Sequence, residues 1–268
     1  MMSMSSNMIN SALAATEAVI DATGKDQYGR PIDYKIVNNE IRRAVSEGVK
    51  NITLMGVMGQ RYIATAVDKK INISINGTPG NNLGAFMDGP FIEVFGNAQD
   101  MTGNTMSSGE IIVHGNAWDV TGLSMRGGKI FVKGNTGTRV GIHMKEFGQM
   151  SPHIVIGGRA GDYLGEYMAG GVILVLGENI PKQISPVGLS IGSGIHGGQI
   201  FIRGKVNANQ LGVGAKLETV NDDDLKLINE LIKEYESWFG SSSSEGDFVK
   251  VVPFSSRPFR GHFDSTLI

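Results

Sequence analysis

Short apolar runs recur along the middle of the chain, separated by polar and glycine-rich segments. Six of them are residues 91–95, 110–114, 129–133, 153–156, 172–176 and 199–203, and a seventh, at residues 71–75, precedes them. These runs are short and rich in Ile, Val and Phe, which favours strands over helices. The pattern therefore predicts seven short strands and disfavours a solenoid built from helices.

Glycine marks the period of this pattern. Gly84, Gly103, Gly122 and Gly141 are spaced by nineteen residues, and Gly165 and Gly194 follow after insertions. Strands that recur at such a spacing stack about 4.8 Å apart, so that each rung of the coil donates hydrogen bonds to the next. We therefore predict an all-β-dominated chain: a right-handed parallel β-helix of about seven rungs, in which these six glycines form structural turns.

Alternation along each strand assigns its residues to two faces. One inward column holds Ile92, Ile111, Ile130, Ile154, Ile173 and Ile200, and a second holds Val94, Val113, Val132, Ile156, Val175 and Ile202. A third column consists of Met87, Met106, Met125, Met144 and Met168, each three residues after a rung glycine. Because thioether side chains adapt to irregular gaps, we expect these methionines to pack inside the coil.

Asparagine follows the glycine that ends three of the strands, at Asn97, Asn116 and Asn135. Asn tolerates left-handed backbone, and stacked side-chain amides can hydrogen-bond along the axis of a coil. We therefore interpret these three residues as structural.

The outward positions of the strands are polar in the first two rungs and apolar afterwards. The column begins with Ser74 and Glu93 and continues through Ile112, Phe131, Val155, Leu174 and Phe201. A solvated sheet face would be polar throughout, and a contiguous apolar patch usually marks an interaction site. The candidate interface is therefore Ile112, Phe131, Leu174 and Phe201, to be covered either by the chain's own ends or by another subunit.

Segments of different character flank the coil. Before it, residues 38–48 predict a helix capped by Asn38 or Asn39 and stopped by Gly48, and strands are predicted at residues 52–55 and 61–66. After it, helical spacing within residues 221–239 predicts an amphipathic helix suited to the apolar outer face; its apolar residues are Leu225, Ile228, Leu231, Ile232, Tyr235 and Trp238. We divide the chain into an α/β cap (1–70), the β-helix (71–215) and a C-terminal helix with a docking tail (216–268).

Composition and charge exclude several kinds of function. The chain has 268 residues and no cysteine, which removes disulfides, thiolate zinc sites, cysteine-ligated iron–sulfur clusters and cysteine nucleophiles. The formal net charge of -2 supplies no basic field that would attract nucleic acid or an anionic membrane surface. Apolar runs fall far short of the roughly twenty residues that span a bilayer, so we expect a cytoplasmic protein with neither nucleic acid nor membrane as a partner.

One polar constellation remains after the common motifs for phosphate binding, zinc proteases and nucleophile elbows are found missing. His143, Tyr167 and His196 each lie two residues after a rung glycine and should stack on consecutive rungs, beside Arg126 and Glu166. Such a cluster could bind a metal ion or transfer protons, but it lacks a third histidine, so turn hydrogen bonds or a contact with another protein are favoured. The residues alone assign no catalytic, cofactor-binding or metal-binding side chain.

Several longer strings resemble those of one known family. They are GNAQDMTGNTM, DVTGLSMRGGKIFV, RVGIHMKEFG, GEYMAGGVILVLG and GIHGGQIFIRG, within a match that runs from about Val37 to Leu211. In them the chain resembles the GXGXG domain, the C-terminal β-helical domain of the glutamate synthase large subunit, which some organisms have as a separate subunit. It is less similar to the formylmethanofuran dehydrogenase subunit that shares the repeat.

The resemblance implies a scaffold. In glutamate synthase this domain lies between the amidotransferase and the flavin barrel, and it carries no catalytic residue that transfers to this chain. The resemblance implies that FMN and iron–sulfur clusters reside on partner subunits and that this chain binds none; a homo-oligomer stays open. The implied function is a non-catalytic scaffold subunit for the glutamine-dependent amination of 2-oxoglutarate.

Two alternatives stay open. The same scaffold could serve formylmethanofuran dehydrogenase or a glutamate methyltransferase complex. In another class, an independent β-helix enzyme could cleave acidic carbohydrate in an exterior groove, which needs clustered outward carboxylates. Glu93 is the lone strand carboxylate of the outward column, and this weighs against the enzyme.

Overall fold

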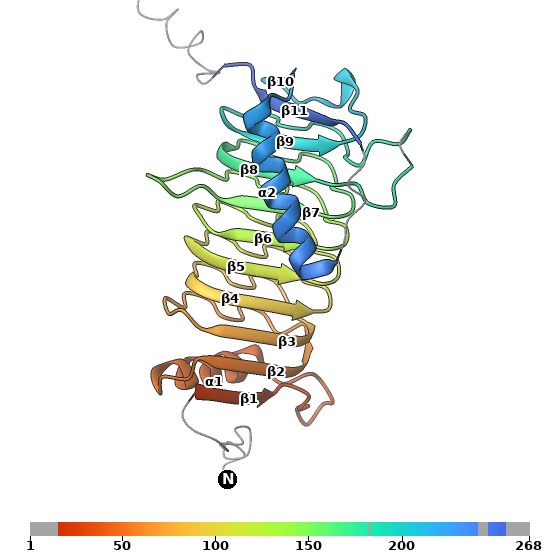
Figure 1. The fold of residues 1–268 in the computed structure, drawn as a ribbon. Coiled ribbons are helices and arrows are strands. Elements are labelled where there is room, and N and C mark those ends of the chain that lie inside the picture. The colour runs from red at the N-terminus through yellow and green to blue at the C-terminus, as the bar shows by residue number, and fades with distance from the viewer. Residues whose placement is uncertain (1–15, 182, 241–245, 256–268) are drawn as a thin grey trace, which may run out of the picture.

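The fold is a coil of short strands that stack into one continuous sheet (Figure 1). The computed structural model describes residues 16–181, 183–240 and 246–255. The strands are β1 (Glu17–Asp21), β2 (Asn51–Met58), β3 (Asn72–Thr78), β4 (Asp88–Phe95), β5 (Ser108–Val113), β6 (Lys129–Val132), β7 (His153–Ile156), β8 (Ala169–Val175), β9 (Gly197–Arg203), β10 (Ala215–Glu218) and β11 (Phe248–Pro253). Each strand from β1 to β8 pairs in parallel with the next, up to β9, which confirms the predicted parallel β-helix, with about six turns.

The pairing register places equivalent side chains of successive strands beside one another along the axis. Ile111 of β5 lies opposite Ile92 of β4 and Ile130 of β6, and the same register continues to Ile200 in β9. All members of the two predicted inward columns are fully buried. Together with apolar residues of both ends, they form one cluster that fills the interior of the coil.

Glycines form the turns of the coil because their backbone there is left-handed. Gly84, Gly103, Gly122, Gly141 and Gly165 have φ between 64° and 73°. A β-carbon at Gly103 would also collide with Cδ1 of Ile130 in the next rung. A side chain at Gly103 is therefore disfavoured both by backbone strain and by lack of space.

The last turn departs from the predicted frame. Gly192 has φ 64° and donates its N–H to the Leu164 carbonyl, as Gly165 does to Val140. Gly192 is therefore the equivalent of the other turn glycines, whereas Gly194 lies two residues further along the chain. The prediction chose Gly194 because the insertion around residues 181–186 interrupts the spacing and the sequence offers both glycines.

The methionine column is confirmed as part of the interior. Met87, Met106, Met125, Met144 and Met168 are all fully buried. In the last rung Ile195 takes the same position, since its N–H bonds to the Gly192 carbonyl as that of Met168 bonds to Gly165. A branched apolar side chain thus replaces the thioether where the coil approaches its end.

The asparagine ladder is structural, but its geometry differs from the prediction. Oδ1 of Asn97 accepts a hydrogen bond from the N–H of Asn116 at 2.8 Å, and Asn116 accepts from Asn135 at 2.7 Å. Asn135 continues the series by accepting from the N–H of Arg159 at 2.8 Å. None of the three asparagines has a left-handed backbone. Each side-chain oxygen therefore takes the place of a backbone carbonyl as the acceptor between rungs. The side-chain amides of the three asparagines do not hydrogen-bond to one another.

The N-terminal segment extends the sheet. β1 and β2 add two parallel strands beyond β3 (Figure 1). The strand predicted at residues 61–66 is wrong, because Tyr62, Ala64 and Ala66 have left-handed backbone and form a turn of the coil. The helix of this segment, α1 (Tyr34–Ser46), buries Val37, Ile41 and Ala44 in the interior cluster.

The start of α1 also differs from the prediction. Asp33 caps the helix by accepting a hydrogen bond from the N–H of Lys35 at 2.8 Å, so the helix begins before Asn38 and Asn39. Asn38 instead lies inside the helix and donates to the Arg61 carbonyl at 2.9 Å. The end of the helix before Gly48 agrees with the prediction.

The C-terminal helix α2 (Asp222–Phe239) lies along the outer face of the sheet (Figure 1). A capping box of Asn221 and Asp224 fixes its start, and its bounds agree with the prediction. Leu225 differs, because it is 43% exposed and takes no part in the buried face. Beyond α2, β11 pairs antiparallel with β9 and β10, so this part of the predicted docking tail packs on the chain's own coil. Residues 256–268 of the tail lie outside the described residues.

Candidate functional site

The candidate interface is covered by the chain's own helix. Ile112, Phe131, Leu174 and Phe201 have 0% exposure and pack in a cluster that α2 completes with Ile228, Leu231, Ile232 and Tyr235. These four residues are therefore not an exposed contact surface for another subunit. Of the two covers that the sequence left open, the structure shows the C-terminal segment of the same chain.

Glu234 and Tyr235 of α2 both make polar contacts with the coil. Nζ of Lys129 in β6 lies 2.7 Å from Oε1 and 2.6 Å from Oε2 of Glu234. The Tyr235 hydroxyl donates to Oε2 of Glu178 at 2.9 Å, in a space that stays open because Gly157 has no side chain. Burial raises the pKa of Tyr235 far above its ordinary value, so this hydroxyl remains a hydrogen-bond donor.

A row of ionisable side chains lies beside these contacts. Glu110, Lys129 and His153 are direct partners in the register of β5, β6 and β7. Burial raises the pKa of Glu110, and the charge of Lys129 acts against this shift. Burial lowers the pKa of His153, and Lys129 lowers it further. This row was not predicted from the sequence, although its signal is visible as an ionisable residue directly before each of the inward residues Ile111, Ile130 and Ile154.

The predicted polar stack is present for two of its three members. The rings of His143 and Tyr167 lie 5.3 Å apart, with 9° between their planes. Both residues have left-handed backbone, with φ 55° and 52°, and they occupy equivalent places in successive rungs. Tyr167 is 42% exposed, so the stack lies on the surface of the coil.

His196 does not belong to this stack. Its N–H donates to the Met168 carbonyl, as Ala169 donates to Met144, so His196 is equivalent to Ala169. The place next to the Tyr167 ring is taken by Gly194. The prediction for His196 was wrong because it counted two residues from Gly194, whereas the turn glycine of this rung is Gly192.

The arginines near the stack are bound by the coil itself. Nε of Arg139 donates to Oε2 of Glu166 at 2.8 Å, and its guanidinium lies 4.5 Å from the centre of the Tyr163 ring. Nη1 of Arg126 donates to the carbonyl of His143 in the neighbouring rung at 3.1 Å. The cluster thus brings Arg126, His143, Glu166 and Tyr167 together as predicted. It offers a flat aromatic pair beside an ion pair, chemistry suited to contact with another protein surface.

Two kinds of site are not found in the described part of the chain. Across residues 16–181, 183–240 and 246–255, no three His, Asp or Glu side chains are grouped so that they could hold a metal ion. Within the same residues, no helix has both the length and the apolar character needed to cross a bilayer.

The outward carboxylate of β4 is engaged in a hydrogen bond with a histidine. Oε1 of Glu93 lies 2.8 Å from Nε2 of His114, whose ring stacks on Phe95 at 5.0 Å. The same ring meets the edge of Phe239, at the end of α2, at 5.2 Å. Glu93 is thus part of a packed contact with the helix end, which weighs further against an exterior carbohydrate-cleaving groove.

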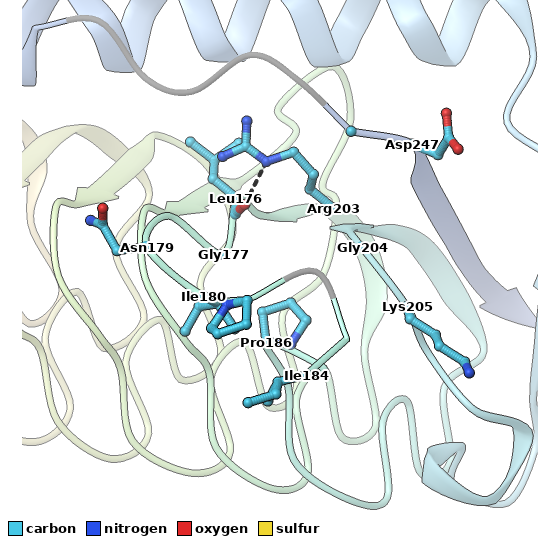
Figure 2. A pocket seen from close by; sticks show the side chains of 12 residues that line it. Leu176, Gly177, Asn179, Ile180, Ile184, Pro186, Arg203, Gly204, Lys205 and Asp247 are labelled. Atoms are coloured by element: carbon cyan, nitrogen blue, oxygen red, sulfur yellow. Dashed lines mark hydrogen bonds between the residues drawn. The ribbon is translucent and has the colours of Figure 1, made fainter.

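A hollow of about 410 Å³ lies beside the last rungs (Figure 2). Arg203 crosses its wall and donates from Nε to the Leu176 carbonyl at 2.6 Å. Its two terminal nitrogens are shielded from solvent and have no hydrogen-bond partner among the described residues. Burial lowers the pKa of Arg203, while the charge of Glu178 opposes that shift. Because Glu178 already supplies a compensating negative charge, we assign no anionic ligand to this hollow.

Comparison with known proteins agrees with this architecture. A family model described as "GXGXG motif" matches residues 19–251, from within β1 to within β11. This chain belongs to the GXGXG motif family. The family is that of the C-terminal domain of the glutamate synthase large subunit, which confirms the predicted resemblance.

One relative of this GXGXG chain is matched over nearly its whole length. It is a protein of Methanocaldococcus jannaschii named "Uncharacterized protein MJ1350", and it is 46% identical over 254 residues, which cover 91% of this chain and 95% of the relative. The name of that protein states no activity. The match therefore supports a shared fold and leaves function to be argued from the chain itself.

Proposed function

We propose that this GXGXG chain is a non-catalytic scaffold subunit of a glutamate synthase-like complex that aminates 2-oxoglutarate with glutamine. The observation that carries the proposal is the family match, since it covers residues 19–251. In this proposal a separate amidotransferase releases ammonia, and a separate subunit with FMN and iron–sulfur clusters consumes it. The coil holds the two partners in a fixed relation.

The construction of the coil supports a scaffold. Hydrogen bonds join every rung from β1 to β9, and one apolar cluster fills the interior along the whole stack. The apolar outer face is closed by α2. The His143–Tyr167 pair remains at the surface of the turns, beside the exposed side chain of Arg139, which is paired with the buried Glu166. Because rung pairing restrains their backbone, these side chains present a fixed surface to a partner.

Reconstitution with purified subunits tests the proposal. The amidotransferase and the flavoprotein are mixed with and without this chain, and both complex formation and glutamate production are measured. We expect glutamine-dependent amination to require the chain, and ammonia-dependent amination by the flavoprotein to proceed without it. Full glutamine-dependent activity in its absence, or failure of the three proteins to associate, contradicts the proposal.

A pair of matched variants tests the surface of the turns. Tyr167→Ala removes one ring of the aromatic pair, and Phe86→Ala removes an exposed ring from the equivalent turn position of an earlier rung. If the partner contacts the His143–Tyr167 surface, only Tyr167→Ala weakens association, while both variants keep the thermal stability of the wild type within a few degrees. Equal weakening by both assigns the contact elsewhere.

A further inference from the structure

The two ends of the sheet are finished differently. At the C-terminal end, β11 turns antiparallel and is followed by β10, whose Lys216 and Glu218 pair with each other at 3.3 Å. At the N-terminal end, β1 pairs only with β2 within the described residues. Figure 1 shows β1 at the lower end of the stack, with no described strand beyond it. Among the described residues, one long edge of β1 therefore has no strand beside it.

The backbone of β1 provides the hydrogen-bonding groups for such a strand. The N–H of Ala22 donates to the Met55 carbonyl of β2 at 2.8 Å, so the even-numbered residues of this segment turn their backbone groups toward β2. Backbone groups of a paired strand point alternately to its two sides, which directs those of Glu17, Val19 and Asp21 to the open edge. A row of unpaired N–H and C=O groups is a template for another strand.

The side chains of β1 give this edge its chemistry. Glu17, Val19 and Asp21 are exposed, and the two residues between them are buried. Neither carboxylate forms an ion pair with a described residue. Oδ1 of Asp21 accepts hydrogen bonds from the N–H and the hydroxyl of Thr23, which lower the pKa of Asp21 and keep it charged. The exposed side of the edge strand is thus acidic, apolar and acidic in turn.

We propose that the open edge of β1 binds an extended segment of a partner protein by strand addition, and that this segment carries a basic, an apolar and a basic residue at alternate positions. Main-chain hydrogen bonds supply affinity in this mode of binding, and the alternate side chains supply specificity. Basic residues would lie beside Glu17 and Asp21, where opposite charges on neighbouring strands are stabilising. The inference deepens the proposed scaffold function by naming a contact surface, and it rests on that function only for the existence of a partner.

Charge decides against two other occupants. If two copies of this chain paired antiparallel through β1 about Val19, Glu17 of each would lie opposite Asp21 of the other, and like charges in that position are destabilising. The first fifteen residues of the chain contain no Lys or Arg, so they lack the complementary charge as well. A basic segment from another protein fits the edge better than either.

Peptide binding to the full-length protein tests this inference. The probe is the fluorescently labelled peptide acetyl-Thr-Lys-Ala-Val-Ala-Lys-Thr-amide, and its matched control has Glu in place of both Lys residues. We expect the basic peptide to bind at least about tenfold more tightly than the acidic one. Binding should slow amide hydrogen exchange in β1, and the Glu17→Lys variant should lose the preference for the basic peptide. N-methylation of the peptide amides that face β1 should abolish binding without any change to the protein.

Several outcomes overturn the inference. Equal affinity for the two peptides, binding that survives N-methylation, or no binding of the basic peptide at millimolar concentration each contradicts it. If light scattering shows a dimer, and the Glu17→Lys variant changes the amount of that dimer, the edge is assigned to a second copy of this chain. Peptide binding that appears only after removal of residues 1–15 assigns it to the chain's own N-terminus. If the reconstituted complex forms and works equally well with the Glu17→Lys variant, this inference fails while the proposed function stands.

Discussion

Lys250 of β11 binds Asp224 in the first turn of α2, with Nζ 2.9 Å from Oδ1 and 3.0 Å from Oδ2. The two side chains are only 9% and 7% exposed. Asp224 also accepts the N–H of Asn221 in the capping box. One buried carboxylate thus fixes the start of the helix and joins α2 to β11, the strand that pairs with β9.

Removing one partner of this pair should cost more than removing both. Asp224→Asn leaves a buried ammonium group without its counter-ion, and we expect it to lower the free energy of unfolding by about 3–5 kcal/mol. Glu218, 3.7 Å from Lys250 and 46% exposed, compensates little. The double variant Asp224→Asn with Lys250→Met should recover much of the loss, as measured by urea unfolding. Additive losses of the two single variants would contradict the coupling.

A turn glycine inside the coil should tolerate alanine less well than a turn glycine outside it. Gly103 has φ 70° and no room for a β-carbon beside Ile130, whereas Gly148 has φ 62° and nothing within 4 Å. We expect Gly103→Ala to cost about 2–5 kcal/mol, from left-handed strain and overpacking together. Gly148→Ala should cost only about 1–2 kcal/mol, from strain alone. Equal losses in urea unfolding would show that space in the interior is not limiting.

The stability that the asparagine ladder contributes should depend on the side-chain oxygen of each asparagine and not on its side-chain nitrogen. Asn116→Ala removes the acceptor for the N–H of Asn135, and we expect a loss of about 1 kcal/mol. Asn116→Asp keeps an oxygen in the same place and should be nearly neutral. Amide hydrogen exchange at Asn135 checks the mechanism, because it should accelerate in the Ala variant and stay slow in the Asp variant. Fast exchange in both would assign the role to the amide nitrogen.

Much of the coil could be predicted from the sequence because its signals are local. Ile111 and Ile130 stack because alternation within a strand and a constant spacing between strands each act over few residues. The segment of residues 61–66 was wrongly predicted as a strand, since the left-handed backbone of its turn is taken by Tyr62, Ala64 and Ala66 and no glycine marks it in the sequence. The frame around Gly192 was lost where an insertion broke the spacing.

The helical spacing of residues 221–239 predicted a helix suited to the outer face, but its individual contacts with the coil could not be derived from local pattern. Lys129 and Glu234 are 105 residues apart in the chain, so nothing near either residue marks their contact. The His143–Tyr167 pair was predictable because both residues keep a constant distance from a turn glycine. The ionisable residues of the row that includes His153 can be read from the sequence. Their burial could not be predicted, because it depends on where α2 lies.

The pKa of His153 should make the protein less stable on mild acidification. Burial, the largest cause, and the charge of Lys129 lower this pKa, while Glu234 and Glu146 act in the opposite direction. The unfolded chain takes up the proton near the ordinary pKa of about 6.5, and the folded chain does so only at lower pH. Stability is therefore lost as the pH falls from above 6.5 toward the folded pKa, since there the unfolded state binds more protons.

Urea unfolding at a series of pH values from about 7 to about 4 measures this effect and covers the ordinary pKa values of His and Glu. We expect the free energy of unfolding to fall more steeply in the wild type than in His153→Gln, whose side chain does not titrate. Glu110 acts in the opposite sense, because its raised pKa lets the folded state bind a proton first and gain stability as the pH falls. Glu110→Gln should therefore lose stability more steeply than the wild type. Parallel curves for the wild type and His153→Gln would mean that His153 is protonated equally well in the folded and unfolded states.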